Sequence, residues 1–455
     1  MKLLGKYFVA LCMGLMITNG AAQDSVATAI ETPFAWTLQD CINWAKQQNI
    51  TVQRNKVKVL SSQIDVNDAK ANRLPTVDFS TSQYVSNRPF QETYSGVIGT
   101  EVVSFSNKNS YSGNYNLNAS MNLYNGGQTK NNIRLAEINS QIAELQVLAS
   151  ELTIEEQITQ LYIQVLYSQD AVIHDDELIA LAEVQLEQAR ARKKAGLLNK
   201  ADVLQFESQL AQDKYQKVSD QTALEGYCLQ LKQLMELDGD ETLVLADPKL
   251  TNNVLAELPN KQEVFQNAVA SRPELKAQQL AMDKTYIDEE IAKAGSKPVI
   301  YANAGISTTN SSGNGNMFTQ LKNQWSNGIG VSLTIPIWDH GKTKNAVARA
   351  RLERENTYLD MVETQKNLWK TIETYWLQAH NNQQRYIAAQ EKVEYCRESY
   401  ALTSEQFRLG LKNIVELTQD KTNLSIATQQ MLQAKYEALL NMALLKYYNG
   451  ENISF

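Results

Sequence analysis

The sequence is poor in the residues and patterns on which most catalytic and metal sites depend. It contains only three histidines, His174, His340 and His380, and their spacing fits no metal-ligand pattern. It has no glycine-rich phosphate loop, nucleophile elbow or zinc-binding helix. The run His174-Asp175-Asp176 is predicted to lie on a solvated helix face. We therefore predict no catalytic site, no metal and no bound cofactor, and we expect no nucleic-acid partner.

Cysteines and long hydrophobic runs are scarce as well. Beyond residue 22 the cysteines are Cys41, Cys228 and Cys396, and an odd number at wide spacing predicts no disulfide framework. No apolar run beyond residue 22 approaches the ~18 residues of a membrane-spanning helix. If the chain enters a membrane, it must therefore do so with β-strands, the other structure that can satisfy its backbone groups in lipid.

The first 22 residues have the pattern of a secretory signal peptide. Lys2 and Lys6 precede an apolar run over residues 7–17, and small residues follow at Gly20 and Ala22. We predict cleavage near Ala22 and exclude residues 1–22 from the fold. Removing the two lysines changes the formal net charge from −7 to −9.

One stretch of the chain alternates strictly between polar and apolar residues. From Asn114 to Leu123 every even-numbered position holds asparagine or serine, and every odd-numbered position holds an apolar residue. This period-two pattern indicates a β-strand with one wet face and one dry face. An edge strand of a soluble sheet and a transmembrane barrel strand of roughly 9 to 11 residues both fit a single strand of this kind.

The second half of the sequence repeats the first. YNGGQTKNNIRLAE from Tyr124 aligns with WDHGKTKNAVARAR from Trp338 at an offset of 214 residues. The same offset relates GLLNKADVLQFESQL from Gly196 to GLKNIVELTQDKTNL from Gly410, and it places a second alternating strand at residues 329–337. Each repeat is predicted to run helix, strand, loop, strand, helix, tight turn, helix. The predicted repeats are residues 23–250 and 251–455.

Each repeat also contains a proline-free interval of 69 positions between two glycines, 127–196 and 341–410. Both intervals are rich in Ala, Leu, Gln, Glu and Lys, and a helix of this length would measure about 100 Å. Such a helix cannot fold back into a compact domain. We predict that Gly196 and Gly410 end the two helices in the left-handed conformation, and that Asn199 and Asn413 cap the helices that follow.

With these motifs the chain resembles the TolC-type outer-membrane efflux protein family. The resemblance is carried by paired A-K-A-x-x-x-P boxes that end at Pro75 and Pro298, by the junctions YNGG and WDHG, and by the turns KAGLLNKAD and RLGLKNIVE. The segment WTLQDCINWAKQQN from Trp36 is similar to the opening helix of that family. The similarity covers essentially the whole chain beyond the signal peptide.

The resemblance implies an α+β membrane protein with an internal two-fold repeat. Four transmembrane β-strands per subunit would join in a homotrimer to form a 12-stranded β-barrel in outer-membrane lipid. A long periplasmic α-helical barrel of coiled-coil helices would continue it. Physical reasoning also requires an oligomer, because four strands cannot close a barrel and open edges in lipid leave backbone groups unpaired. The segments Asn87 to Gly113 and Thr308 to Gly328 would be external loops.

In this arrangement the asparagines face the water of the pore, and the apolar positions of both alternating strands face lipid. The predicted lipid-facing residues are Tyr115, Leu117, Ala119, Met121, Leu123, Ile329, Val331, Leu333, Ile335 and Ile337.

A passive duct needs a gate and a docking surface, and both are expected at the periplasmic tips formed by the two turns. The resemblance implies that Asp202 and Lys412 latch neighbouring helix pairs, that Phe407 adds an aromatic group to this latch, and that Glu416 and Gln419 form rings at the constriction. Because Gln419, which would form the second ring, carries an amide and not a carboxylate, the sequence argues against strong cation selectivity. The predicted adaptor-docking residues are Gly196, Leu197, Asn199, Gly410, Leu411 and Asn413.

These expectations combine into a passive outer-membrane exit duct of a tripartite efflux or type I secretion system. Its partners would be an inner-membrane transporter and a periplasmic adaptor, or membrane fusion protein. The alternative from a different class is a soluble periplasmic coiled-coil scaffold or adaptor. The apolar strand faces at matching places in both repeats favour the duct.

Overall fold

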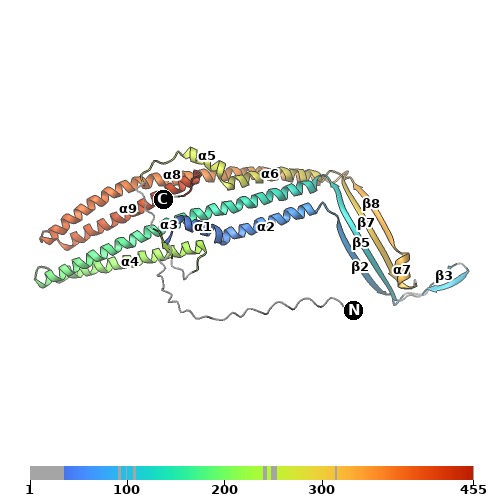
Figure 1. Cartoon of the computed structure of the whole chain (residues 1–455), viewed down its shortest axis with the longest axis horizontal. Coiled ribbons are helices and arrows are strands. Elements are labelled where there is room, and N and C mark those ends of the chain that lie inside the picture. The colour runs from blue at the N-terminus through green and yellow to red at the C-terminus, as the bar shows by residue number, and fades with distance from the viewer. Residues whose placement is uncertain are drawn as a thin grey trace, which may run out of the picture.

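A computed structural model describes residues 35–90, 94–98, 100–105, 109–238, 243–246, 254–312 and 315–453. The predicted signal peptide and the predicted repeat boundary at residue 250 lie outside these ranges. The molecule is elongated, with a four-stranded sheet at one end and the turns of two helical hairpins at the other (Figure 1). The sheet and the hairpin turns are therefore far apart, with long helices between them.

Two pairs of shorter helices precede the strands, one pair in each half of the chain. They are α1 (Leu38–Gln48), α2 (Ile50–Ala71), α5 (Lys261–Ser271) and α6 (Pro273–Ala294). Local residues set their starts. Thr37 forms a capping box with Asp40 at the start of α1, and Asn49 and Asn260 accept hydrogen bonds from the first turns of α2 and α5.

Four longer helices form two antiparallel hairpins. They are α3 (Gln128–Lys194), α4 (Lys200–Met235), α8 (Lys342–Arg408) and α9 (Ile414–Tyr448). Helices α3 and α8 each contain 67 residues, so each is about 100 Å long. The prediction of two such helices is confirmed. Apart from the loop between the two long strands, the order of helices and strands is the same in both halves of the chain.

Four antiparallel strands form the sheet, in the spatial order β2-β5-β7-β8. They are β2 (Thr76–Asn87), β5 (Asn109–Asn125), β7 (Val299–Ser311) and β8 (Ser326–Thr334). The central pair, β5 and β7, joins the two halves of the chain. Strands β2 and β8 are the edges, and each pairs with one neighbour only within the described chain.

The segments predicted as external loops connect the strands at the end of the sheet away from the helices (Figure 1). The first contains a hairpin of β3 (Tyr94–Ile98) and β4 (Glu101–Phe105). The second contains the short helix α7 (Met317–Asn323). Strand β7 continues to Ser311, so the second loop begins four residues later than the predicted start at Thr308.

The main hydrophobic core lies around the middle of α3 and α8, where the shorter helices pack against them. Strand β1 (Ala35–Trp36) pairs there with β6 (Val244–Leu245) in parallel. Fully buried side chains come from seven helices: Ile42, Val52, Ile158, Leu231, Val264, Ile372 and Leu445. Over the described residues, no helix is both long enough and apolar enough to cross a membrane.

Candidate channel wall and gate

The strands place most of the predicted lipid-facing residues on one face of the sheet. Paired residues lie directly opposite each other and share a face, and one such row holds Val77, Ala119, Ala304 and Ile329. Alternate rows add apolar residues to this face: Phe79, Tyr115, Leu117, Met121, Ala302, Ile306, Val331 and Leu333. The row of Val77, Ala119, Ala304 and Ile329 is apolar on all four strands, whereas Thr81, Thr308 and Asn327 add polar groups to the same face nearer the loops.

The opposite face of the sheet is polar. Asn118 Nδ2 donates a hydrogen bond to Asp78 Oδ2 across β5 and β2, at 3.3 Å. Glycines leave room for the asparagine side chains. A Cβ atom on Gly330 would lie only 3.0 Å from Asn303 Oδ1, and one on Gly305 would lie 3.4 Å from Asn118 Oδ1. The polar face therefore carries asparagine side chains that lie close to the strands; Asn118 is hydrogen-bonded to Asp78, whereas Asn122 Oδ1 has no hydrogen-bond partner in the described part of the chain.

The alternation fails at two places, and three predicted lipid-facing residues are affected. A β-bulge lies between Asn122 and Tyr124, so Tyr124 rather than Leu123 pairs with Ile300. The prediction that Leu123 continues the apolar row is therefore wrong. Strand β8 ends at Thr334, because Pro336 has no N–H to donate to a ladder. The predicted strand residues Ile335 and Ile337 lie beyond that end, and both are exposed.

Both hairpin turns have the predicted local structure. Gly196 and Gly410 have φ angles of 77° and 79°, the left-handed conformation that glycine adopts without strain. Asn199 and Asn413 begin α4 and α9, and each forms a capping box with the third residue of its helix. The predictions for the conformation of these four residues are confirmed.

Each turn also presents an apolar side chain to solvent. Leu197 is 74% exposed and Leu411 is 73% exposed. Neither side chain contributes to a buried cluster of the described chain. Exposed leucines beside a tight turn are therefore available for contact with another protein.

The predicted latch residues make local contacts within the subunit. Asp202 Oδ2 accepts a hydrogen bond from Asn199 N at 3.2 Å, because Asp202 is the acidic member of the α4 capping box. Lys412 forms an ion pair with Glu416 on the first turn of α9. The hydrogen bond from Lys412 lowers the pKa of Glu416. Among the described residues there is no ion pair between Asp202 and Lys412.

Phe407 lies between the two hairpins. Its ring packs edge-on against Phe206, with 5.9 Å between ring centroids. The guanidinium of Arg192 lies 5.8 Å from the Phe407 ring centroid and donates hydrogen bonds to the backbone oxygens of Phe407 and Arg408, at 3.4 and 3.2 Å. The sequence analysis missed Arg192, although it lies in the last turn of α3, where a basic residue suits a helix C-terminus.

A second link between the hairpins also escaped the sequence analysis. Lys421 Nζ on α9 lies 2.6 Å from Asp213 Oδ2 on α4, and it donates a hydrogen bond to the backbone oxygen of Leu178 on α3 at 3.3 Å. The lysine follows Ile414 and Leu417 on the buried stripe of α9. A charged residue at the same helical spacing as these buried apolar residues is the sequence signal that could have revealed this link.

Asp175 is buried, contrary to the prediction of a solvated helix face. Only 6% of the residue is exposed, and its Oδ2 atom has no hydrogen-bond partner in the described part of the chain. Burial, together with hydrogen bonding to Asp220, raises the pKa of Asp175 to about 7. The neighbouring Asp176 is exposed and pairs with Lys217, so the prediction is right for that residue alone.

Comparisons with known proteins support this arrangement. The family model described as "Outer membrane efflux protein" matches residues 41–236 and 264–451, which together make up most of the chain. The match begins in α1 and ends just after α9, and it includes the sheet and both hairpin turns.

Individual relatives are more distant. The chain is 24% identical over 185 residues to the alkaline protease secretion protein AprF of Pseudomonas aeruginosa, and that alignment covers 40% of this chain but only 37% of AprF. It is 21% identical over 319 residues to the outer membrane protein TolC of Vibrio cholerae, with 69% of this chain and 72% of TolC covered.

Among solved structures, CusC superposes with a TM-score of 0.76 at 16% identity, over 90% of this chain and 91% of CusC. This likeness establishes the fold, and the family match establishes the relationship. The chain belongs to the outer membrane efflux protein family, whose members are channels rather than enzymes, and its sheet lies in the outer membrane with the helices in the periplasm.

Proposed function

We propose that the chain is one subunit of a passive, trimeric exit duct that works with a periplasmic adaptor and an inner-membrane transporter. One observation carries this proposal: the sheet has an apolar face, a polar face and two unpaired edges, β2 and β8. An unpaired backbone group in lipid costs several kcal/mol, so each edge must pair with another copy of the chain. Three copies with four strands each would give a 12-stranded barrel.

The two faces define the wall of this duct. The apolar face, which includes Val77, Ala119 and Ile329, would contact lipid, and the polar face with Asn118 and Asn303 would line a water-filled lumen. Transport through such a lumen needs no binding pocket, because the transporter supplies the energy and selects the substrate. This proposal covers small-molecule efflux and type I secretion alike.

The gate of the duct would lie at the hairpin tips, with Asp202, Phe407 and Lys412 as its latch and with Glu416 and Gln419 at the constriction. A latch between neighbouring helix pairs would have to compete with the local contacts of its members. Asp202 already caps α4, and Lys412 already pairs with Glu416. The open and closed arrangements would then differ little in free energy, as a gate that responds to a partner requires.

The adaptor would dock at the two turns, where Leu197 and Leu411 are exposed. Leu197→Asp and Leu411→Asp should reduce co-purification of the adaptor, because a carboxylate cannot be buried cheaply in an apolar contact. Leu148→Asp is a matched control, since Leu148 is 50% exposed on α3 but far from the turn. Equal adaptor recovery with all three variants would remove the turns from the docking surface.

We also propose that the two halves of the chain, residues 23–250 and 251–455, are structural repeats. The support is the common order of elements outside the loops between the long strands, and the common length of α3 and α8.

Reconstitution of the purified full-length protein tests the proposed duct. Native mass spectrometry should give the mass of three subunits, and the same sample should conduct ions in planar lipid bilayers. A trimer that inserts into lipid but conducts no ions would contradict a duct. Recovery of the protein from the soluble periplasm without detergent would contradict the membrane barrel itself.

A further inference from the structure

The four places where helices meet strands lie together at one end of the sheet (Figure 1). We call residues 69–75, 126–134, 291–298 and 335–345 the junction belt. Since the sheet lies in the outer membrane and the helices in the periplasm, the junction belt lies at the inner-leaflet surface of that membrane.

The junction belt is strongly basic. Its basic residues are Lys70, Arg73, Lys130, Arg134, Lys293, Lys297, Lys342 and Lys344, and its one acidic residue is Asp339. The whole chain is acidic, with 43 basic and 50 acidic residues. A local excess of seven positive charges in an acidic protein therefore needs a physical explanation.

The subunit does not neutralise most of these charges. Lys70 pairs with Glu137 at 3.1 Å, and Lys293 pairs with Glu290 at 2.8 Å. The other six cations have no ion pair within the described ranges. Asp339 forms no ion pair with them over the residues that the structure describes; its two carboxylate oxygens accept hydrogen bonds from the backbone N–H groups of Gly341 and Thr343.

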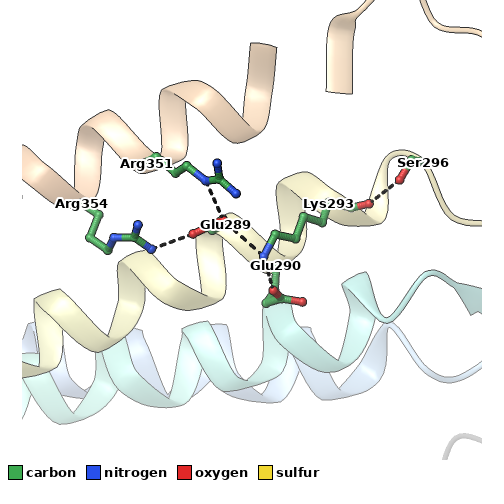
Figure 2. A network of polar contacts seen from close by, with 6 residues as sticks. All are labelled: Glu289, Glu290, Lys293, Ser296, Arg351 and Arg354. Carbon is green, nitrogen blue, oxygen red and sulfur yellow. Dashed lines mark hydrogen bonds and ion pairs between the residues drawn. The ribbon is translucent and has the colours of Figure 1, made fainter. Parts of the chain in front are cut away.

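The acidic residues nearest to the belt on α6 are also occupied. Figure 2 shows Glu289 held by Arg351 and Arg354 of α8 and by Lys293, with contacts of 3.0, 2.7 and 3.2 Å. Hydrogen bonds from these cations, the largest from Arg351, lower the pKa of Glu289 to about 2. This network ties α6 to α8 and leaves Glu289 no capacity to balance the belt.

Helix electrostatics do not explain the lysines either. Lys130 and Lys344 occupy the first turns of α3 and α8, which contain no acidic residue. The N-terminal end of a helix favours negative charge, so a lysine there is unfavourable unless an anion lies nearby.

The flanking side chains match a membrane surface. Trp338 is 77% exposed and Ile337 is 96% exposed, and both lie between the end of β8 and Lys342. Tryptophan concentrates at the headgroup level of membranes, and basic residues beside it are attracted to anionic lipids. We propose that the junction belt binds the phosphate groups of anionic phospholipids in the inner leaflet of the outer membrane. This inference rests on the membrane placement and not on the proposed gate.

The test compares lipid binding by the trimer in nanodiscs that contain either phosphatidylglycerol or phosphatidylcholine. The variant Lys130→Gln/Lys342→Gln/Lys344→Gln removes three exposed charges from the belt. Its control, Lys193→Gln/Lys194→Gln/Lys200→Gln, removes three exposed charges at the hairpin turn of α3 and α4. We expect wild type and control to retain phosphatidylglycerol preferentially in native mass spectrometry, and the belt variant to bind it on the order of 100-fold more weakly.

A salt titration of the wild type tests the same proposal without a variant. Preference for phosphatidylglycerol should fall as ionic strength rises, because salt screens exposed charges over about 10 Å at 0.1 M. Three results would overturn the proposal. The first is equal phosphatidylglycerol binding by the belt and control variants, and the second is that inorganic phosphate alone stabilises the trimer as much as phosphatidylglycerol does. The third is unchanged phosphatidylglycerol binding by the belt variant together with a change in its ion selectivity. The last result would place these lysines in the lumen.

Discussion

The ammonium group of Lys421 on α9 lies 2.6 Å from the carboxylate of Asp213 on α4, and the two side chains are only 5% and 9% exposed. This ion pair joins the two helical hairpins near their tips, a region where most other ion pairs lie on the surface within one hairpin. Asp213 receives a second hydrogen bond from Gln209 Nε2, at 2.7 Å. A charge pair buried between two hairpins holds them in one arrangement.

Replacing Lys421 by methionine should destabilise the helical part of the molecule. The change leaves the Asp213 carboxylate buried without its cation, and breaking a buried pair in this way costs about 3–5 kcal/mol. The double variant Lys421→Met/Asp213→Leu should recover most of the loss, since it leaves no unpaired charge. Helix loss followed by circular dichroism during urea unfolding measures both effects. If single and double variants lose the same stability, the ion pair is not the source of the effect.

Arginine on the two faces of β5 should have opposite consequences. Ala119→Arg introduces a charge on the apolar face, opposite Val77 and Ala304, at a cost of roughly 2 to 4 kcal/mol near the bilayer midplane. Asn118→Arg places the same side chain on the polar face, where it stays hydrated. The yield of assembled trimer in outer-membrane fractions should fall for Ala119→Arg only. Equal yields would reject the assignment of the apolar face to lipid.

The gate proposal predicts changes in conductance and ion selectivity. Lys412→Ser should increase single-channel conductance by weakening the latch, and it should increase cation preference because Glu416 loses its partner. Glu416→Gln should reduce cation preference, and Gln419→Glu should increase it, with both effects larger at low salt. Planar-bilayer recordings measure all three variants. Unchanged conductance and selectivity throughout would remove these residues from the gate.

The buried Asp175 predicts a loss of stability as pH rises. In the folded chain its carboxyl group keeps a proton up to about pH 7, whereas in the unfolded chain the ordinary pKa is 3.8. The protonated group therefore stabilises the fold fully below about pH 4, and this contribution is lost as pH rises through 7. Asp175→Asn should raise stability at pH 8, on the order of 1 to 3 kcal/mol, and change it little at pH 4.

Thermal unfolding at both pH values checks this prediction. Asp176→Asn is the control, because the neighbouring Asp176 is exposed and paired with Lys217. A wild type and an Asp175→Asn variant with parallel stability curves between pH 4 and pH 8 would show that Asp175 does not titrate in this range.

The sequence by itself determined the local features of this protein. The period-two pattern of Asn114 to Leu123 defines a strand with two unlike faces, since successive side chains point to opposite sides. Gly196 and Gly410 end the long helices, and Asn199 and Asn413 begin the next ones, because these requirements involve only residues three or four positions apart. The repeated order of such signals carried the resemblance to the family, and the expected fold followed from that resemblance.

Only the tertiary structure decided which of these elements meet and what their contacts bury. The bulge at Leu123 depends on the register between β5 and β7, two strands far apart in the chain. The burial of Asp175 and the pairing of Lys421 with Asp213 depend on how α3, α4 and α9 pack, and a charged residue on a helix gives no sign of which neighbour will cover it. Local patterns follow from backbone geometry, whereas burial and charge pairing follow from contacts between distant segments.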